Sequence, residues 1–274
     1  MLALLAAFAV LVLAALDYAR LETLWIALDE QTVSSPRLPD GFNGAKIAFI
    51  SDLHADNAAD FALMAEQVQK INAFSPDLVL LGGDFADSED AQCAIFAVLR
   101  NLRASIGVYA VRGNHDVVAC GDRFWNIVSA AGITPLQNQS ICLERNGSHI
   151  ALAGVDDFEH HLSYPADALR DVSSDAFCLF LAHEPNSVIQ AKKQGLLAQV
   201  DRAFVGHTHG GQVTVFGLLS PWAERLFPGV GSKWIRIGST PTLYSNGLGQ
   251  KYDLRFFARP QIHLITLVGT PAKR

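Results

Sequence analysis

The apolar positions of the chain follow two spacings, and the order in which these spacings appear predicts an α/β fold. Residues 46–51, KIAFIS, form a short apolar run that is typical of a buried strand. Residues 59–74 then carry apolar side chains three or four positions apart, at Phe61, Met64 and Val68, which is the spacing of an amphipathic helix. The main body of the chain therefore begins with a strand followed by a helix.

The same alternation continues downstream. Strand and helix patterns take turns in residues 76–84, 91–102, 107–116 and 122–132. Asn146-Gly147, between two apolar runs, predicts a hairpin turn. Later apolar runs are mostly strand-like and lie in residues 176–186, 201–211, 233–238, 242–247 and 261–269. This order predicts a layered α/β domain with mixed strand pairing.

The start of the chain has a different character. Residues 1–16, MLALLAAFAVLVLAAL, contain no charge and no helix breaker, and Tyr18 and Leu21 extend the stretch past Asp17. Because about 20 apolar residues span a bilayer, we expect a membrane anchor within residues 1–28. A cleaved signal peptide is one alternative, although the basic region that usually precedes its apolar part is missing. A buried helix of a soluble fold is the other.

A linker or first-strand region is expected over residues 29–45, and a globular domain over residues 46–274. No Lys or Arg precedes the anchor, whereas Arg20, Arg37 and Lys46 follow it. The positive-inside tendency therefore places the domain in the cytoplasm.

Composition narrows the class of protein. Half of the 274 residues are hydrophobic and the formal net charge is −6, with a mean hydropathy of +0.22. This balance argues against a nucleic-acid binder, which would carry a basic face. The four cysteines lack C-x-x-C spacing and lie in or beside apolar runs, so reduced core residues are expected at Cys93, Cys120, Cys142 and Cys178.

Five separate apolar runs end in Asp, Asn or His. The residues concerned are Asp52, His54, Asp84, Asn114, His115, Asp116, His183, His207 and His209. In open α/β sheets, ligands bind at the carboxyl edge of the strands, where the connecting loops gather. Side chains that are distant in sequence are therefore expected to meet at one edge.

The chemistry of this set favours metal ions over a catalytic triad. A triad needs one nucleophile, one base and one orienting group, and no Ser or Cys stands at these strand ends as an obvious nucleophile. Imidazole together with carboxylate suits Mn²⁺, Fe²⁺ or Zn²⁺. Two such ions that share a carboxylate would lower the pKa of a water between them and neutralise phosphoryl oxygens. The set therefore points to hydrolysis of phosphoesters.

The motifs DLH, GGD, GNHD, AH and GHTH occur in that order from about Lys46 onward, and in this the chain resembles the calcineurin-like metallophosphoesterases. The ending GHTHGGQ and the later LYSNGLG are similar to a membrane-associated bacterial branch, which includes phosphodiesterases and UDP-2,3-diacylglucosamine hydrolases. The resemblance implies an α-β-β-α sandwich of two mixed sheets flanked by helices, with two divalent metal ions bridged by Asp84 and a hydroxide.

The resemblance also implies roles for individual residues. One ion would be held by Asp52, His54, Asp84 and His209, and the other by Asp84, Asn114, His183 and His207. His115 would face the substrate as general acid or charge stabiliser, with Asp116 orienting its ring. His207 and His209 would point to the same side of an extended stretch.

Other residues are weaker candidates. Arg112 is a candidate for contacting a substrate phosphate, with an ion pair to a neighbouring carboxylate as the alternative. The GVDDFEHH stretch is expected to be a solvated loop near the site and not a third metal centre, with Asp157 touching substrate. It also carries the polar residues Asp156, Glu159, His160 and His161.

Residues 216–238 are too apolar for an ordinary exposed loop, and they predict either core packing or a segment that enters lipid headgroups. Together with the anchor, this segment favours a phosphodiester or pyrophosphate substrate that is partly lipid. UDP-2,3-diacylglucosamine, a precursor of lipid A, is the example that the resemblance offers.

Two alternatives remain open: the same chemistry on soluble nucleotides, nucleic acid or phosphoproteins, and an inactive scaffold. No nucleic-acid partner is expected, a monomer is the default, and the resemblance implies the bacterial inner membrane.

Overall fold

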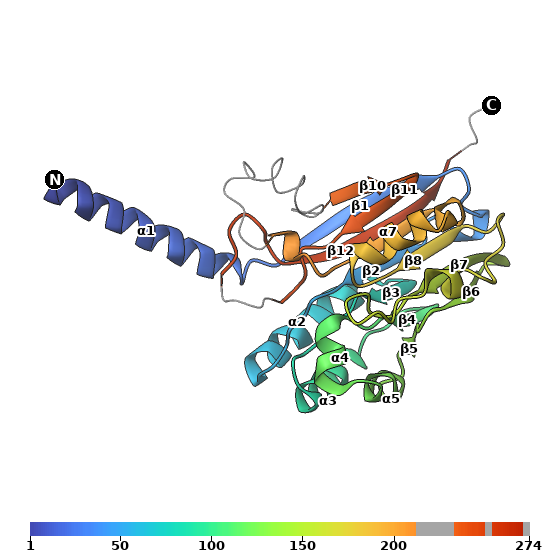
Figure 1. Ribbon diagram of the computed structural model, residues 1–274, viewed down its shortest axis with the longest axis horizontal. Helices are drawn as coiled ribbons and strands as arrows, with labels where there is room; N and C mark the ends of the chain where they lie inside the picture. The colour runs from blue at the N-terminus through green and yellow to red at the C-terminus, as the bar shows by residue number, and fades with distance from the viewer. Residues whose placement is uncertain (212–232, 250–253, 271–274) are drawn as a thin grey trace.

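Two six-stranded sheets form the centre of the molecule (Figure 1). The computed structural model describes residues 1–211, 233–249 and 254–270. The first sheet has the order β1 (Ala27–Ser35), β12 (Gln261–Gly269), β2 (Lys46–Ile50), β3 (Leu78–Leu81), β4 (Gly107–Ala110) and β5 (Thr134–Pro135). The second has the order β10 (Lys233–Ile237), β11 (Thr240–Tyr244), β9 (Arg202–Val205), β8 (Cys178–Leu181), β7 (Ser148–Gly154) and β6 (Gln139–Arg145).

Both sheets are mixed, as predicted. Strands β2 to β5 run parallel, and β12 pairs antiparallel with β2 but parallel with β1. In the second sheet β7, β8, β9 and β11 run parallel, with β6 and β10 antiparallel at the edges.

Helices cover the outer face of each sheet. The first sheet carries α2 (Ala58–Phe74), α3 (Glu89–Leu99), α4 (Asn114–Cys120) and α5 (Arg123–Ala130), and the second carries α6 (Pro165–Ala168) and α7 (Pro185–Lys193). Short 3₁₀ turns lie at Asp40–Phe42, Leu196–Gln199 and His209–Gly211. The α-β-β-α sandwich is confirmed.

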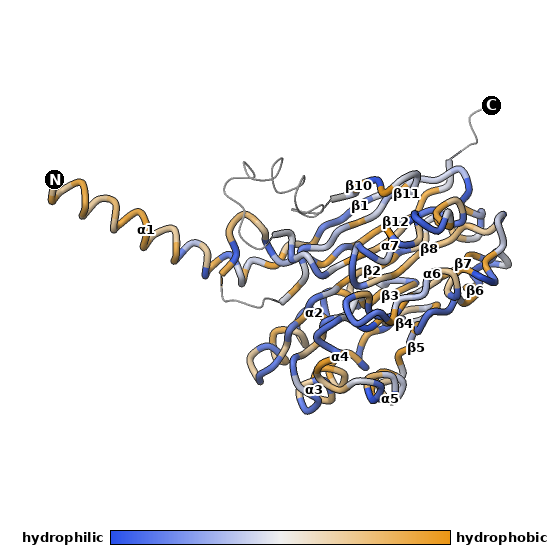
Figure 2. Tube along the Cα trace, viewed as in Figure 1, coloured by the Kyte–Doolittle hydropathy of each residue, from blue (hydrophilic) through white to orange (hydrophobic). Residues whose placement is uncertain are grey.

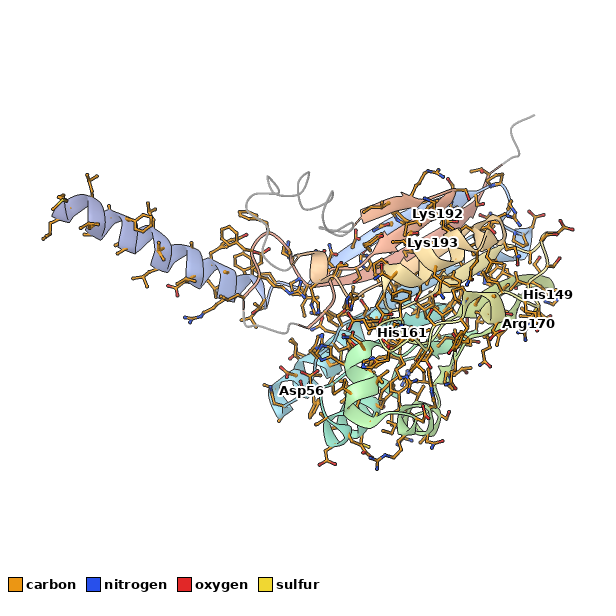
Figure 3. All side chains as sticks on the ribbon, viewed as in Figure 1. Asp56, His149, His161, Arg170, Lys192 and Lys193 are labelled. Carbon is orange, nitrogen blue, oxygen red and sulfur yellow. The ribbon has the colours of Figure 1, made fainter. Side chains whose placement is uncertain are left out.

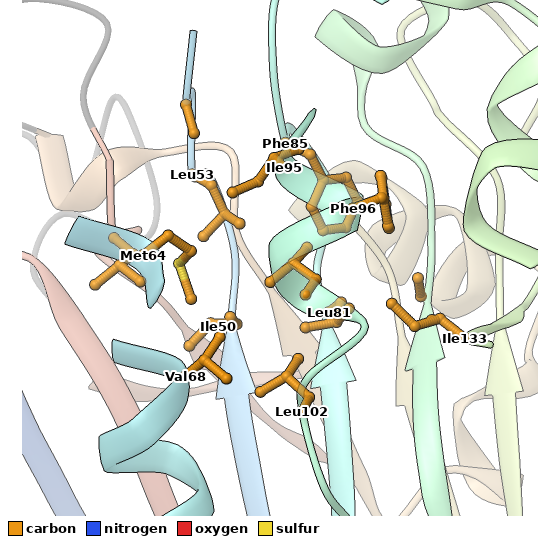
Figure 4. Packing of buried hydrophobic residues seen from close by; sticks show 14 of the residues in the cluster. Ile50, Leu53, Met64, Val68, Leu81, Phe85, Ile95, Phe96, Leu102 and Ile133 are labelled. Atoms are coloured by element: carbon orange, nitrogen blue, oxygen red, sulfur yellow. The ribbon is translucent and has the colours of Figure 1, made fainter. Parts of the chain in front are cut away.

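Alternate side chains of β2 contribute to two different hydrophobic layers of the sandwich. Ile47 and Phe49 pack into the core between the sheets, whereas Ala48 and Ile50 pack against the helices. Figure 4 shows Ile50 in this helix-facing layer, close to Val68 of α2. Because successive strand residues point to opposite faces, a fully apolar strand is required where both faces are covered.

Helix α2 begins and ends where its sequence dictates. The Asn57 side chain accepts hydrogen bonds from the backbone N–H groups of Ala59 and Asp60, which caps the first turn. The helix stops at Ser75, which adopts a left-handed conformation before Pro76. The observed helix therefore begins one residue before the predicted helix over 59–74, and both end at the same residue.

The predicted hairpin is also present. Strands β6 and β7 pair in antiparallel register, with Arg145 opposite Ser148. Asn146 and Gly147 both have positive φ, 51° and 72°, as a two-residue type I′ turn requires.

Helix α1 (Leu2–Glu22) extends away from the sandwich (Figure 1) and is apolar along most of its length (Figure 2). It has 21 residues and a mean hydropathy of 2.3 over its most apolar window, so it is long and apolar enough to cross a membrane. At its base, the Glu22 carboxylate accepts from the Phe257 N–H at 2.7 Å. The Ala19 carbonyl accepts from the Arg255 N–H at 2.9 Å. Helix α1 ends at Glu22, whereas the predicted anchor range extends to residue 28. That range therefore includes the start of β1, which begins at Ala27.

Three details differ from the sequence analysis or lie beyond it. All four cysteines are free, but Cys93 and Cys142 are exposed, while Cys120 and Cys178 are buried as predicted. Most of the apolar segment 216–238 falls outside the described residues. Within its described part, Trp234 packs against Phe204 of the inter-sheet core, and its ring N–H donates to Gln31.

Candidate metal centre

The polar ends of five strands meet at one edge of the sandwich. Strands β2, β3 and β4 supply residues from the first sheet, and β8 and β9 supply residues from the second. Five of the predicted ligands have positive φ, namely Asp52, His54, Asp84, His207 and His209. Backbone of this kind costs free energy in residues other than glycine, and it is typical of functional sites that the surrounding structure holds in place.

A first cluster contains Asp52, His54 and His209, whose ligand atoms lie within 4.8 Å of one another. The Nε2 atoms of His54 and His209 are 3.1 Å apart. The His209 Nε2 atom lies 3.6 Å from Oδ1 of Asp52. The donors predicted for one cation therefore converge.

A second cluster contains Asp84, His183 and His207. The His183 Nε2 atom lies 3.1 Å from Oδ2 of Asp84. Asn114 joins this group, because its Oδ1 atom lies 3.2 Å from Nδ1 of His207. The donors predicted for the other cation also converge.

Asp84 lies between the two clusters. Its Oδ2 atom is 3.1 Å from Nε2 of His183 and 3.7 Å from Nε2 of His54. Its Oδ1 atom accepts the backbone N–H of His115 at 2.9 Å, which fixes the carboxylate. A carboxylate in this position can contact groups bound on either side.

Buried atoms without partners indicate that the clusters fit divalent cations. The Nδ1–H of His183 donates to the Gly82 carbonyl at 2.7 Å, which directs Nε2 toward the cluster. That Nε2 atom and Oδ2 of Asp52 are buried and make no hydrogen bond among the described residues. A native protein rarely buries such acceptors without a partner, and a cation would satisfy both.

The charges of the cluster perturb one another strongly. Burial disfavours the charged form of Asp84, but the neighbouring His183, His54 and His115 together outweigh burial and hold the pKa of Asp84 well below its usual range. Burial also opposes the charge on His183, yet Asp84 raises the pKa of His183 well above its usual value. Burial lowers the pKa of His209 to about 4. Such opposed shifts are typical of functional sites.

The structure assigns the orientation of His115 to Asp87 and not to Asp116. The Nδ1 atom of His115 lies 2.7 Å from Oδ1 of Asp87. The oxygens of Asp116 instead accept the backbone N–H groups of Gly113, Asp84 and Phe85, so Asp116 braces the loop that carries Asp84. The expectation that Asp116 orients the His115 ring is corrected on this point.

Asp87 is a member of the candidate site that the sequence analysis missed. Its Oδ1 atom also lies 3.4 Å from Nδ1 of His54, so one carboxylate contacts a predicted ligand and the predicted acid. Its only sequence signal is its place three residues after Asp84, beside the helix cap Ser88.

Arg112 is a structural residue and not an open phosphate contact. Its side chain is only 1% exposed and forms a two-pronged pair with Asp156, at 2.8 and 2.7 Å. The guanidinium also lies over the Trp125 ring, at 4.9 Å from its centroid. Of the two alternatives for Arg112, the ion pair with a neighbouring carboxylate is the one that the structure shows.

Replacing Arg112 by alanine is expected to destabilise the fold by about 3–5 kcal/mol, because the buried carboxylate of Asp156 would lose its partner. Thermal unfolding of the full chain measures this loss. Arg123→Ala is the control, since the exposed pair of Arg123 with Glu89 should contribute under about 1 kcal/mol. Unchanged stability with a raised KM for phosphoesters would restore the substrate role.

Asp157 is buried as well, which corrects its predicted contact with substrate. Its Oδ2 atom lies 2.8 Å from Nδ1 of His160. Burial raises the pKa of Glu184 well above its usual value, and the neighbouring Asp157 carboxylate raises it further. From the same loop, Oε1 of the half-exposed Glu159 lies 3.4 Å from Nε2 of His207. Glu159 is therefore the loop residue that faces the cluster.

Two glycines permit the close approach of backbone to the cluster carboxylates. A Cβ atom at Gly113 would lie 2.2 Å from Oδ1 of Asp84, and one at Gly206 would lie 2.3 Å from Oδ2 of Asp52. The late LYSNGLG stretch supports the same region, since the Gly249 N–H donates to the Asp52 carbonyl at 2.7 Å. Only glycine leaves room at these contacts.

The two-sheet sandwich brings His and Asp side chains together at its strand ends, in clusters that could hold metal ions. The family described as "Calcineurin-like phosphoesterase" matches residues 45–211. The chain belongs to the calcineurin-like phosphoesterase family, and it is a hydrolase of phosphoric esters.

Relatives extend the match beyond the family region. "Uncharacterized metallophosphoesterase YkuE" of Bacillus subtilis is 31% identical over 265 residues, covering 92% of this chain and 90% of that protein. The bovine "Transmembrane protein with metallophosphoesterase domain" is 29% identical over 88% of this chain, which spans 57% of the bovine protein. The structure of a 5′-nucleotidase precursor from Thermus thermophilus has the same fold, with a TM-score of 0.52 and 11% identity over 83% of this chain and 55% of that one. Helix α1 and the transmembrane relative together support association with a membrane.

Proposed function

We propose that the protein is a membrane-anchored phosphoesterase that uses two divalent cations to hydrolyse phosphodiester or pyrophosphate bonds. The observation that carries this proposal is Asp84, whose Oδ2 atom lies near His183 in one cluster and His54 in the other. One cation would be held by Asp52, His54, Asp84 and His209. The other would be held by Asp84, Asn114, His183 and His207. Mn²⁺, Fe²⁺ and Zn²⁺ suit this mixture of imidazole and oxygen ligands.

When bound, the cations lower the pKa of water and neutralise phosphoryl oxygens. The protein orients the donors that hold them, as when the Gly82 carbonyl fixes the tautomer of His183. His115 supplies the proton that the leaving oxygen requires, and Asp87 holds its ring through Nδ1. Because Asp87 takes Nδ1, the opposite nitrogen, Nε2, is the atom that donates to the leaving group.

The membrane helix favours a substrate at a lipid surface. A lipid-linked phosphodiester or pyrophosphate, of which UDP-2,3-diacylglucosamine is an example, would reach the site without leaving the bilayer. The proposed location is the bacterial inner membrane, with the domain on the cytoplasmic side because Arg20 lies in the last turn of the helix and Arg37 follows it.

The first test is hydrolysis of bis-p-nitrophenyl phosphate by the full-length protein in detergent, after removal of metals and addition of Mn²⁺. We expect turnover that depends on added metal and that exceeds the turnover of the monoester p-nitrophenyl phosphate by about tenfold or more. Metal-dependent hydrolysis of lipid-linked nucleotides in preference to lipid-free nucleotides would support the membrane substrate.

The alternatives predict different results in the same assays. Equal rates on free and lipid-linked nucleotides would favour a hydrolase of soluble nucleotides. Absence of turnover in protein that measurably contains two metal ions would favour an inactive scaffold. A preference for the monoester would contradict the proposed bond specificity.

A further inference from the structure

A cavity of about 400 Å³ connects the base of helix α1 with the metal centre. Leu24, just after α1, lines one part of it, and His54, a predicted ligand, lines another. Helix α2 forms a wall through Ala59 and Leu63, which lie one helical turn apart. The cavity therefore lies between the expected membrane surface and the predicted cations.

About half of the lining is apolar. Besides Leu24 and Leu63, the side chains of Leu53, Met64 and Leu248 contribute to it. A cavity of a few hundred Å³ has the size of a small-molecule site. Its apolar side chains suit contact with a hydrocarbon chain.

The surface outside the cavity is also apolar. Exposed large side chains lie around the base of α1, with Leu21 51%, Leu24 64% and Trp25 45% exposed. The ring of Trp25 packs edge-on against Tyr18 of the helix. Tryptophan and tyrosine favour the boundary between lipid and water. A chain that moves from the bilayer into the cavity would thus pass over apolar surface.

The polar part of the lining excludes a phosphate from the cavity itself. Asp56 (Figure 3) and Asp60 border it, and their carboxylates already accept the backbone N–H groups of Asp87 and Asp56, respectively. An anionic group beside these two carboxylates would be repelled. The phosphoester must therefore lie at the cation clusters beyond His54, with only an uncharged chain in the cavity.

We infer that this cavity binds an acyl or alkyl chain of a membrane lipid whose phosphoester lies at the cation site. The inference rests on the proposed function and adds the place where the lipid chain of the substrate binds. The chain enters beside Leu24, packs along Ala59 and Leu63, and ends its path at His54, where the polar part of the lipid begins.

The test compares two diesters with the same scissile bond, hexadecyl p-nitrophenyl phosphate and ethyl p-nitrophenyl phosphate. Ala59→Trp fills the cavity, and Ala62→Trp is the matched control, because Ala62 is exposed on the same helix but does not line the cavity. We expect Ala59→Trp to raise KM for the hexadecyl ester about tenfold or more. A change of this size corresponds to roughly two methylene groups of the hexadecyl chain that are no longer buried. Both variants should hydrolyse the ethyl ester like the unaltered protein.

A second measurement does not depend on turnover. Hexadecyl phosphate with a terminal diazirine should cross-link to the part of α2 that contains Leu63 in the unaltered protein and in Ala62→Trp, but not in Ala59→Trp.

Three outcomes would overturn the inference. Equal kcat/KM for the two esters, or an equal effect of Ala59→Trp on both, would show that the cavity takes no chain while the phosphoesterase remains. Cross-linking that is unchanged in Ala59→Trp would do the same. Absence of hydrolysis of either ester by metal-loaded protein would remove the proposed function, and the inference with it.

Discussion

Replacing Asp84 by alanine is expected to abolish binding of both cations and, with it, hydrolysis. Its carboxylate faces His183 in one cluster and His54 in the other, so a single substitution removes a ligand from both. Loss of an outer-shell partner alone costs 10- to 100-fold in metal affinity or activity, and the loss of a shared ligand should exceed that range. Metal analysis of the purified full-length protein and calorimetric titration with Mn²⁺ measure the effect.

Asp90→Ala is the matched control for this substitution. Asp90 is an exposed aspartate in the first turn of α3, away from the clusters, and its loss should leave both cations bound. Retention of two tightly bound cations by the Asp84 variant would contradict the shared-ligand assignment.

His115→Ala is expected to retain both cations and to lose about 10²- to 10⁴-fold in kcat, the usual contribution of a general acid. The loss should be larger for a phenyl ester than for a p-nitrophenyl ester, because phenolate is the poorer leaving group and needs the proton more. Parallel measurements of kcat on both esters and of metal content check the prediction. Asp87→Asn should cause a smaller loss in the same direction, since Asp87 acts through the ring of His115.

His161→Ala is the control for this second substitution, because His161 lies exposed on the loop after β7. A loss of equal size on both esters would assign charge stabilisation to His115 in place of proton donation. Loss of a cation would make His115 a ligand. That possibility has a structural basis, because His115 also lies within 4.8 Å of donor atoms from His54 and Asp84.

The clusters could be predicted because each ligand follows directly from its strand. Asp52 follows β2 closely and His183 follows β8 closely, so a correct strand prediction places them at the same edge. Asn146-Gly147 likewise carries its turn geometry in its own sequence. Features of this kind depend on local residues and need no knowledge of the tertiary structure.

The misassigned residues depend on long-range pairing, which a sequence does not display. Arg112 and Asp156 pair from two different sheets, and neither has a local pattern that distinguishes an ion pair from a substrate contact. Asp116 lies next to His115, yet it opens a short helix and its oxygens turn toward the backbone of Asp84. Proximity in sequence was therefore a poor guide to the partner of that ring.

The pairing of β1 with β12 joins two segments that are far apart in the sequence, with Ala27 opposite Gln261. During synthesis β1 leaves the ribosome soon after helix α1, which is apolar enough to enter a membrane. Its partner β12 is synthesised much later. With residues added at about 5–20 per second, β1 remains without that neighbour until β12 has been synthesised. Its exposed backbone is then open to pairing with other chains, so production of the protein should be especially sensitive to truncation of the last strand.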